Sequence, residues 1–297
     1  MPHGQPIVPI LSADGHRFEL IRAPVGKADA CLLFLPGMGL SARQYVPFAR
    51  ALAGSGIDTL VHEWRGLGSS SLRASRRNNW GYRELLELDL DPALTAAREV
   101  SGNRALIVGG HSLGSQLALL AASRRPEDVE GLLIVAGGAP NWRCFGGWMG
   151  LSLQTLFFGM PAVAGMIGHY PGRQLGFAGR EARGVISDWA ASGRSGVYAP
   201  ARMNFDFEAA LARLDRPLLS VHMVDDWFVP QASLDWLTDK LGSTSTRQTD
   251  IDRSGMDGPA DHYRWMKQPA QTAAAIADWA RLQCQTTKSS IAASKRA

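Results

Sequence analysis

A serine flanked by glycines, Ser112, is the residue of this sequence best suited to nucleophilic chemistry. It lies in the run Leu-Ile-Val-Gly-Gly-His-Ser-Leu-Gly at residues 106–114, and an Ala- and Leu-rich segment follows over 115–125. A strand that turns sharply into a helix distinguishes a nucleophilic serine from a chance Gly-x-Ser-x-Gly pattern. Gly110 and Gly114 would avoid collisions where strand and helix pack. The pattern predicts a strained Ser112 at the carboxyl end of a sheet, near helix N-terminal amides that favour negative charge.

A serine hydroxyl reacts readily only when a base accepts its proton and a third group orients that base. We predict that His262 is the base, because it follows the last expected strand and immediately precedes the final helix. His169, in a central insertion, is a competing candidate, and His62 ends a strand and could line a cleft. The other four histidines are assigned to structural positions: His3, His16, His111 and His222.

Two adjacent aspartates, Asp225 and Asp226, follow the strand expected over 217–224 and could orient the base. Adjacent side chains at a strand end point in different directions, so only one of them can face His262. We predict Asp226, because its Asp-x-x-Val-Pro spacing returns the chain into the next helix. Asp225 is then expected to be solvated or to support the loop. The alternative position, after the strand expected over 131–136, holds no carboxylate.

Acyl-transfer chemistry also needs two hydrogen-bond donors for the developing oxyanion. The N–H of Leu113, directly after the nucleophile, is the first predicted donor. The second should come from the turn Pro-Gly-Met-Gly at 36–39, which follows the apolar run 30–35. We assign it to the N–H of Met38, with Gly37 as the neighbouring alternative. A plain turn would explain these glycines equally well.

The elements that must position these groups alternate between strands and helices. This alternation predicts an α/β fold with a mostly parallel, doubly wound sheet, which binds ligands at the carboxyl ends of its strands. A hairpin is expected over 7–11 and 17–21, around Asp14-Gly15. Further strands are expected over 30–35, 59–62, 106–110, 131–136, 217–224 and 244–249, and helices over 42–53, 82–100 (kinked or restarted at Pro92), 115–125, 232–241 and 268–281.

The alternation stops between residues 139 and 200, which predicts a cap inserted into a core formed by 1–138 and 201–283. A basic tail over 284–297 is expected to be frayed. Within the cap, 145–168 carries no charge and is long enough to cross a bilayer, but glycines and Pro161 interrupt it. We interpret it as a lid or pocket wall without an integral membrane span; peripheral membrane contact is the alternative.

An apolar cap above Ser112 would favour an apolar acyl or aromatic substrate group. Each aromatic residue of the cap could instead belong to the core of the cap itself. The residues predicted to bind substrate are Gly37, His111, Trp142, Trp148, Phe157, Phe158 and Trp227.

Composition narrows the functional classes. The 297 residues carry a net charge of +4, and the arginines are not interleaved with stacked aromatics, so no nucleic-acid partner is expected. Three distant cysteines, Cys31, Cys144 and Cys284, show no metal-ligand spacing, so we expect no metal, no cofactor and a reducing, cytoplasmic setting. The N-terminal residues lack the charged and apolar regions of a signal peptide. The oligomeric state is not indicated.

The order Ser112, Asp226, His262, with the Met38 turn upstream, resembles the α/β-hydrolase superfamily over nearly the whole chain. Four segments are similar to a bacterial group of predicted α/β hydrolases without a settled substrate. These are LPGMG at 35–39, WRGLGSS at 64–70, GHSLG at 110–114 and YPGRQLGF at 170–177. The resemblance implies a Ser-His-Asp hydrolase with a helical cap between the sixth strand and the acid. Pro36 departs from the family pattern, in which many relatives carry His before Gly.

The expected activity is a serine hydrolase that cleaves small carboxylic esters, and possible further substrates are thioesters or amides. Three alternatives use the same fold. An acyltransferase would share every residue named; an N-terminal peptidase would want cap carboxylates, for which Glu181 and Asp188 are the candidates; a ligand-binding protein would turn over little. A serine at position 112, where dehalogenases and epoxide hydrolases use a carboxylate, argues against those two chemistries.

Overall fold

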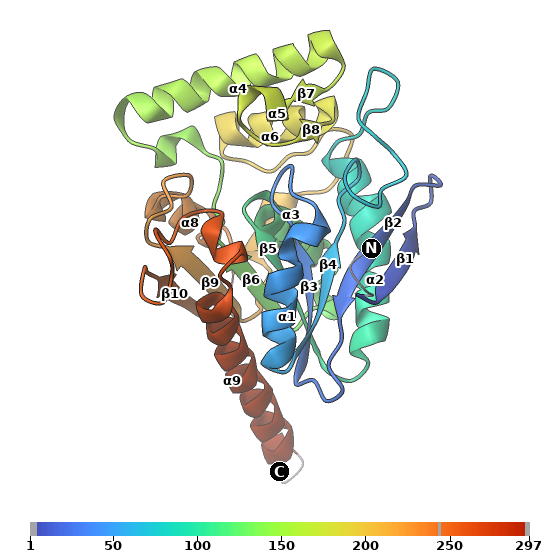
Figure 1. Cartoon of the computed structure of the whole chain (residues 1–297), viewed down its shortest axis with the longest axis vertical. Helices are drawn as coiled ribbons and strands as arrows, with labels where there is room; N and C mark the ends of the chain where they lie inside the picture. The colour runs from blue at the N-terminus through green and yellow to red at the C-terminus, as the bar shows by residue number, and fades with distance from the viewer. Residues whose placement is uncertain (1–4, 243–244, 295–297) are drawn as a thin grey trace.

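A computed structural model describes residues 5–242 and 245–294 and shows an eight-stranded sheet covered by helices on both faces (Figure 1). The strand order is β1-β2-β4-β3-β5-β6-β9-β10. All neighbouring pairs are parallel except β1–β2 and β2–β4. The predicted α/β class and mostly parallel sheet are therefore confirmed. The strands are β1 (Ile7–Leu11), β2 (Arg17–Ala23), β3 (Ala30–Leu35), β4 (Ile57–His62), β5 (Ala105–His111), β6 (Gly131–Val135), β9 (Leu218–Met223) and β10 (Thr246–Ile251).

The central strands β3, β4 and β6 are buried along their whole length, and β3 and β6 are the continuous apolar runs typical of a parallel sheet. On one face of the sheet lie α1 (Val46–Gly54) and α9 (Ala270–Ser294), and on the other α2 (Asp91–Ser101) and α3 (Leu113–Arg124). The helices α7 (Phe207–Ala212) and α8 (Gln231–Thr238) pack on the α3 side.

Two helices differ in detail from the prediction. Before α2, the segment Glu84–Leu90 is a π-helix, and α-helical geometry begins at Asp91, next to Pro92. The change of geometry at Pro92 agrees with the predicted kink or restart. The backbone of α9 continues to Ser294, where the sequence predicts a frayed tail from residue 284; residues 295–297 lie outside the described part of the chain.

The insertion after β6 forms a layer above the carboxyl ends of the strands (Figure 1). Its outermost element is the long helix α4, which packs on α6 through Phe157 and Trp189, whose rings meet edge to face at 5.0 Å. A Cβ at Gly193 of α6 would lie 2.6 Å from the Phe157 ring, so only glycine permits this approach. The elements of the insertion are η4 (Trp142–Cys144), α4 (Gly147–Ile167), β7 (Tyr170–Pro171), α5 (Gly172–Leu175), β8 (Arg180–Glu181) and α6 (Arg183–Ser195).

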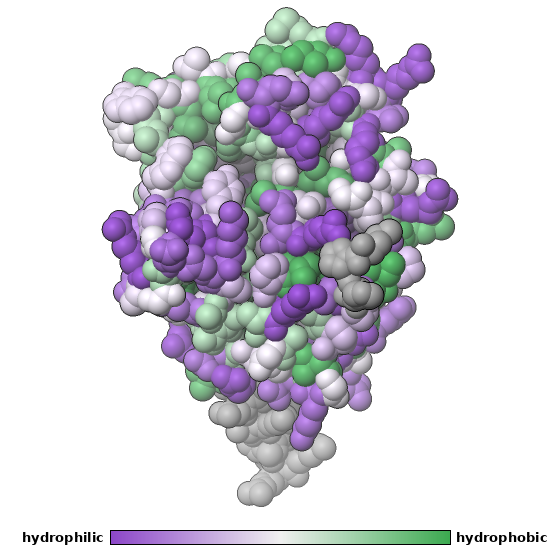
Figure 2. Space-filling model, viewed as in Figure 1, coloured by the Kyte–Doolittle hydropathy of each residue, from purple (hydrophilic) through white to green (hydrophobic). Residues whose placement is uncertain are grey.

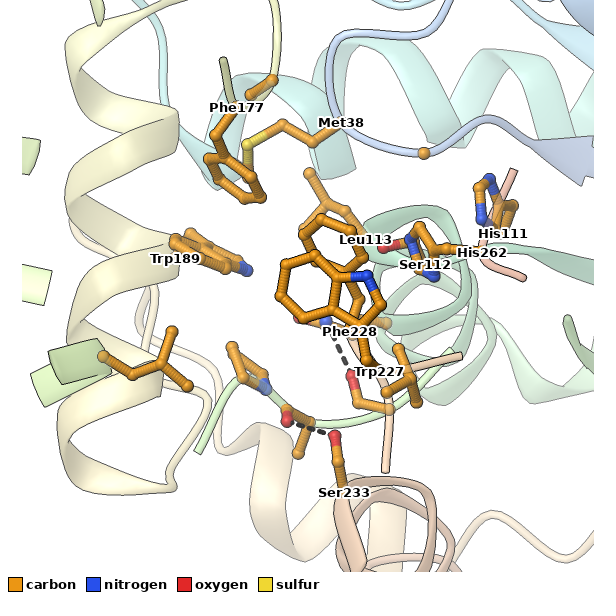
Figure 3. Close-up of a pocket in the computed structure, with 18 of the residues that line it drawn as sticks. Met38, His111, Ser112, Leu113, Phe177, Trp189, Trp227, Phe228, Ser233 and His262 are labelled. Carbon is orange, nitrogen blue, oxygen red and sulfur yellow. Dashed lines mark hydrogen bonds between the residues drawn. The ribbon is translucent and has the colours of Figure 1, made fainter. Parts of the chain in front are cut away.

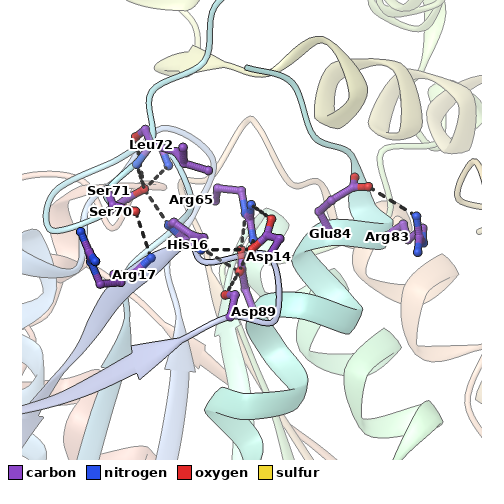
Figure 4. A network of polar contacts seen from close by, with 12 residues as sticks. Asp14, His16, Arg17, Arg65, Ser70, Ser71, Leu72, Arg83, Glu84 and Asp89 are labelled. Carbon is purple, nitrogen blue, oxygen red and sulfur yellow. Dashed lines mark hydrogen bonds and ion pairs between the residues drawn. The ribbon is translucent and has the colours of Figure 1, made fainter. Parts of the chain in front are cut away.

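A buried ionic network ties the hairpin to the segment after β4 (Figure 4). The guanidinium of Arg65 donates to both oxygens of Asp89, at 2.9 and 2.7 Å, and to Asp14 at 2.6 Å. His16 joins Asp89 to Ser70 through its two ring nitrogens. Burial would raise the pKa of Asp89, but the hydrogen bonds from Arg65 and His16 outweigh it and hold that pKa below its ordinary value. Arg65 and Ser70 of the segment WRGLGSS thus hold the loop after β4 in place against the hairpin.

Candidate active site

Ser112 occupies the turn between β5 and α3, as predicted. Its φ of 53° lies in the left-handed region, which costs free energy for a residue with a side chain. The turn is too tight for side chains at the flanking glycines: a Cβ at Gly110 would lie 2.4 Å from Gly114, and one at Gly114 would lie 2.0 Å from the Leu35 carbonyl oxygen. The surrounding packing therefore holds the strained serine at the N-terminus of α3.

His262 and Asp226 are brought together from opposite sides of the last crossover. His262 Nδ1 lies 2.7 Å from Asp226 Oδ2, and both side chains are buried. The second carboxylate oxygen accepts the backbone N–H groups of Phe228 at 2.9 Å and Val229 at 3.2 Å. Because the loop fixes the carboxylate, Asp226 can hold the imidazole with Nδ1 protonated and Nε2 free to accept a proton.

Asp225 faces the other way, toward solvent and the loop that carries His262. It pairs with Arg253 at 2.9 and 2.8 Å and accepts the N–H of Ala260 at 2.9 Å. The hydrogen bond from Arg253 lowers the pKa of Asp225. The structure therefore separates the two aspartates as expected: Asp226 contacts the histidine, and Asp225 supports the loop.

A cavity of about 310 Å³ lies between the sheet and the cap, and Ser112 and His262 both line it. Figure 3 shows these two residues on one side of the cavity and Phe177 and Trp189 of the cap on the other. Within the described part of the chain, the Ser112 hydroxyl makes no hydrogen bond. Hydrogen bonds between such groups are often long in empty sites and shorten when substrate binds. His169, the competing histidine, does not line the cavity.

The turn at 36–39 places one free amide at the cavity. The N–H of Gly37 donates to the Tyr45 hydroxyl at 2.9 Å, and the Pro36 carbonyl accepts Trp64 Nε1–H at 2.8 Å. The Met38 N–H makes no hydrogen bond to any described residue, and the Leu113 N–H is the first amide of α3, which has no intrahelical acceptor. Of the two candidates in the turn, the geometry therefore favours Met38 over Gly37.

The cap touches this turn directly. Gly39 has a φ of 75°, and a Cβ there would lie 2.2 Å from the backbone nitrogen of Gly179. The carbonyl of Ala178 is also within 2.6 Å of that position. The backbone of the turn at 36–39 thus packs directly on the backbone of the cap segment before β8.

His111 lies beside His262, with ring centroids 4.6 Å apart, and is fully buried. Burial, followed by the neighbouring His262, lowers the pKa of His111, so this ring stays neutral. The Tyr45 hydroxyl accepts the Gly37 N–H and also forms a hydrogen bond with His111 Nδ1, 2.7 Å away.

Four of the seven residues predicted to bind substrate line the cavity: Gly37, His111, Phe157 and Trp227. The remaining three, Trp142, Trp148 and Phe158, do not line it. Trp148 and Phe158 lie on the exposed outer side of α4, because Met149, Leu153 and Phe157, spaced four residues apart, turn the opposite side of that helix inward. Trp142 packs against the core in η4, with the Arg143 guanidinium 4.8 Å from its ring.

Sequence reasoning also missed several aromatic residues of the cavity. Phe228 and Tyr263 directly follow Trp227 and His262, so their proximity to the predicted site was a usable signal. Phe177 ends the segment YPGRQLGF, and Trp189 lies among polar residues in the later part of the cap, so neither position carried a signal for the cavity. No group of three or more His, Cys, Asp or Glu residues suited to a metal ion occurs in the described residues.

Comparison with known proteins agrees with this architecture. The model of the family "Serine aminopeptidase, S33" matches residues 26–162. Rhodomycin D methylesterase DauP from Streptomyces sp. (strain C5) is 32% identical over 140 residues, which are 47% of this chain and 44% of that protein. The match thus spans less than half of the length of the methylesterase.

Solved structures extend the likeness to more than nine tenths of the chain. Haloalkane dehalogenase DbeA from Bradyrhizobium elkani USDA94 superposes with a TM-score of 0.64 at 17% identity, covering 94% of this chain and 98% of that one. The esterase domain of a Rhodothermus marinus protein has a TM-score of 0.60 at 17% identity, covering 93% and 97%. At this identity the likeness shows the fold. The sheet order and these structural likenesses show that this chain has the α/β-hydrolase fold, and residues 26–162, a little less than half of the chain, match the serine aminopeptidase family model.

Proposed function

We propose that the protein is a serine hydrolase of carboxylic esters with a bulky apolar or aromatic group. One observation carries the proposal: a strained serine and a histidine held by a buried carboxylate line the same apolar cavity. Backbone strain of the kind seen at Ser112 occurs most often at active-site residues.

In this mechanism Ser112 Oγ attacks the ester carbonyl carbon while His262 Nε2 accepts its proton. Asp226 stabilises the imidazolium, and the N–H groups of Met38 and Leu113 bind the tetrahedral oxyanion. His262 then protonates the leaving alcohol, which leaves an acyl-enzyme on Ser112. Water, deprotonated by His262, attacks this acyl-enzyme and releases the acid.

The cavity lining supports an uncharged substrate. None of its residues is Asp, Glu, Lys or Arg, and aromatic rings face it from both the cap and the core. One polar atom stands out: Gln116 Oε1 is buried without a hydrogen-bond partner among the described residues, while Nε2 donates to the Gly138 carbonyl at 2.8 Å. A buried acceptor of this kind favours a substrate that carries a hydroxyl or N–H donor beside its apolar group.

The peptidase alternative has less support. An N-terminal amine needs a carboxylate at the cavity, yet neither Glu181 nor Asp188 lines it. Glu181 accepts the N–H of Gly179 at 2.9 Å, and burial raises its pKa to about 7. Asp188 accepts the N–H groups of Tyr82 and Ala201. Both carboxylates thus serve the structure of the cap.

The test is covalent labelling with a fluorophosphonate, followed by assays on p-nitrophenyl and naphthyl esters and on methyl esters of aromatic acids. We expect labelling of Ser112 and turnover of the aromatic esters. The Ser112→Ala variant should lose label and on the order of 10⁴-fold or more in kcat. Competition between water and added alcohols as acyl acceptors separates hydrolase from acyltransferase. Ligand binding without labelling or turnover would instead indicate a binding protein.

A further inference from the structure

The cap helix α4 is apolar on two opposite sides, and only one of them is used by the fold. The inner side packs on α6 or faces the cavity, through Met149, Leu153, Phe157, Met160 and Ala164. The outer side carries a second stripe, whose members are spaced three or four residues apart. Its members are Trp148, Leu151, Thr155, Phe158, Ala162 and Met166.

This outer stripe is open to solvent. Trp148 is 75% exposed, Phe158 64% and Met166 67%. Among the described residues, α4 is the one helix long and apolar enough to cross a membrane, and only 22% of its apolar window is buried. A surface helix ordinarily has polar side chains on its outer side, so this exposed apolar stripe indicates an apolar binding partner. Figure 2 shows hydrophobic residues along the top of the molecule, over α4.

Two arginines contact α4 beside this stripe. The guanidinium of Arg194 lies 4.8 Å above the Phe158 ring and donates to the Phe157 carbonyl, and Arg76 donates to the carbonyl of Met166 near the other end of α4. None of the cap arginines, nor the two in the neighbouring loop, pairs with a carboxylate in the described part of the chain. They are Arg143, Arg173, Arg180, Arg183 and Arg194 of the cap and Arg76 and Arg77 of the loop.

The cap offers no exposed negative charge to balance them. Its two carboxylates, Glu181 and Asp188, both accept backbone N–H groups as described above. The surface therefore combines a tryptophan-bearing apolar stripe with a cationic margin. This is the composition of helices that lie at the interface of an anionic bilayer, where arginine binds lipid phosphate and tryptophan sits at headgroup depth.

We infer that the outer stripe of α4 and its arginines dock the protein on an anionic lipid surface, with α4 lying in the plane of the membrane interface. The helix does not need to span, because its inner side remains packed on Trp189 and Gly193 of α6. The stripe and the cavity are separated by the thickness of one helix, since Leu153 and Phe157 line the cavity. Docking itself does not depend on the proposed ester chemistry.

The experiment is flotation of the full chain with vesicles of phosphatidylcholine alone or mixed with phosphatidylglycerol. We expect binding to the mixed vesicles that weakens with added salt. The double variant Trp148→Ser/Phe158→Ser should bind at least about tenfold more weakly, and so should Arg76→Gln/Arg143→Gln/Arg194→Gln. Leu11→Ser and Arg247→Gln, which change exposed residues on β1 and β10, are the matched controls and should bind like the wild type.

Two further measurements keep the outcomes distinct. Ser112→Ala should float like the wild type, so that loss of esterase activity and loss of docking are separable. Trp148→Ser/Phe158→Ser should keep its thermal unfolding midpoint and its hydrolysis of a soluble ester, because neither side chain lines the cavity. Failure of the wild type to float, or equal flotation by the double variant, overturns the inference. So does a dimer that the double variant abolishes, seen without vesicle binding, because the occupant is then a second copy.

Discussion

The core and the cap differ in whether their arginines pair with carboxylates. In the core, arginines pair with two buried carboxylates: Arg65 with Asp89, and Arg22 and Arg104 with Asp58. In the cap, arginines lie at the surface without carboxylate partners, and apolar side chains occupy both sides of α4. Pairing fixes the position of atoms, whereas an apolar surface accepts many ligands of suitable shape. We therefore expect core substitutions to change rate and stability, and substitutions at the cavity to change substrate choice.

The sharpest form of this comparison lies within one loop of the core. Asp226→Asn should lower kcat by about 10⁴-fold, because an amide favours the wrong tautomer of His262. Asp225→Asn should cost less than about tenfold, since it removes an exposed ion pair with Arg253. Steady-state kinetics on the best ester measures both. If Asp225→Asn were the more damaging change, the acid would have to be reassigned.

The next largest effect concerns the buried network. Asp89→Asn leaves the guanidinium of Arg65 buried with too little compensating charge, and should lower the free energy of unfolding by about 3–5 kcal/mol. The matched control is Glu84→Gln, which breaks a more exposed pair with Arg202 and should cost about 1 kcal/mol or less. Urea unfolding measures both. Equal losses in the two variants would show that the buried network contributes no special stability.

Acid should destabilise the core through a second buried group. His62 has no hydrogen-bond partner on either ring nitrogen among the described residues, and burial lowers its pKa to about 3. In the unfolded chain the His62 imidazole is protonated below about pH 6.5, whereas in the folded protein it stays neutral until a much lower pH. Its contribution to the free energy of unfolding is therefore fully present above about pH 6.5 and is lost as the pH falls toward 3. The slope from this group is at most about 1.4 kcal/mol per pH unit.

Urea unfolding of the wild type and of His62→Phe across this range measures the effect. The variant should lose less stability on acidification. Glu63, whose pKa burial raises to about 6, titrates in both proteins, so the difference between them isolates His62. Identical pH dependence in the two proteins would exclude His62 as the source.

The smallest expected effect tests selection at the cavity. Of two aryl esters that differ by one hydroxyl group, the hydroxylated ester should be preferred about tenfold, because Gln116 Oε1 can accept a hydrogen bond from that hydroxyl. Gln116→Leu should abolish that preference. Ser233→Ala is the matched control, because it also lines the cavity and removes a hydrogen bond to the adjacent carbonyl, that of Ala139, without touching the unpaired oxygen. A preference that survives in Gln116→Leu would place the donor elsewhere.

Most of the fold could be predicted because its signals are local. The buried strands β3 and β6 are continuous apolar runs, and the turn at Ser112 needs glycines at two fixed positions. The adjacency of Asp226 and His262 followed from strand ends meeting at one edge of the sheet. These inferences need no knowledge of how distant side chains pack.

The cavity lining could not be predicted to the same degree. Residues 145–168 are apolar throughout, so periodicity could not show that Phe157 points inward and Phe158 outward. Packing on Trp189 and Gly193 sets the rotation of α4, and those residues lie about 35 positions away in sequence. The change from π- to α-helical geometry before α2 likewise has no signal beyond Pro92.

The contact between Gly39 and Gly179 constrains how this protein can vary. A methyl group at Gly39 would reach within 2.2 Å of the facing backbone, and one at Gly179 within 2.9 Å of the Gly39 Cα. A mutational library that diversifies the cap to obtain new specificities must therefore keep both glycines, or it will displace the Met38 turn as well. In the mechanism that we propose, the Met38 turn binds the oxyanion, so a change at this contact should alter substrate choice and turnover together.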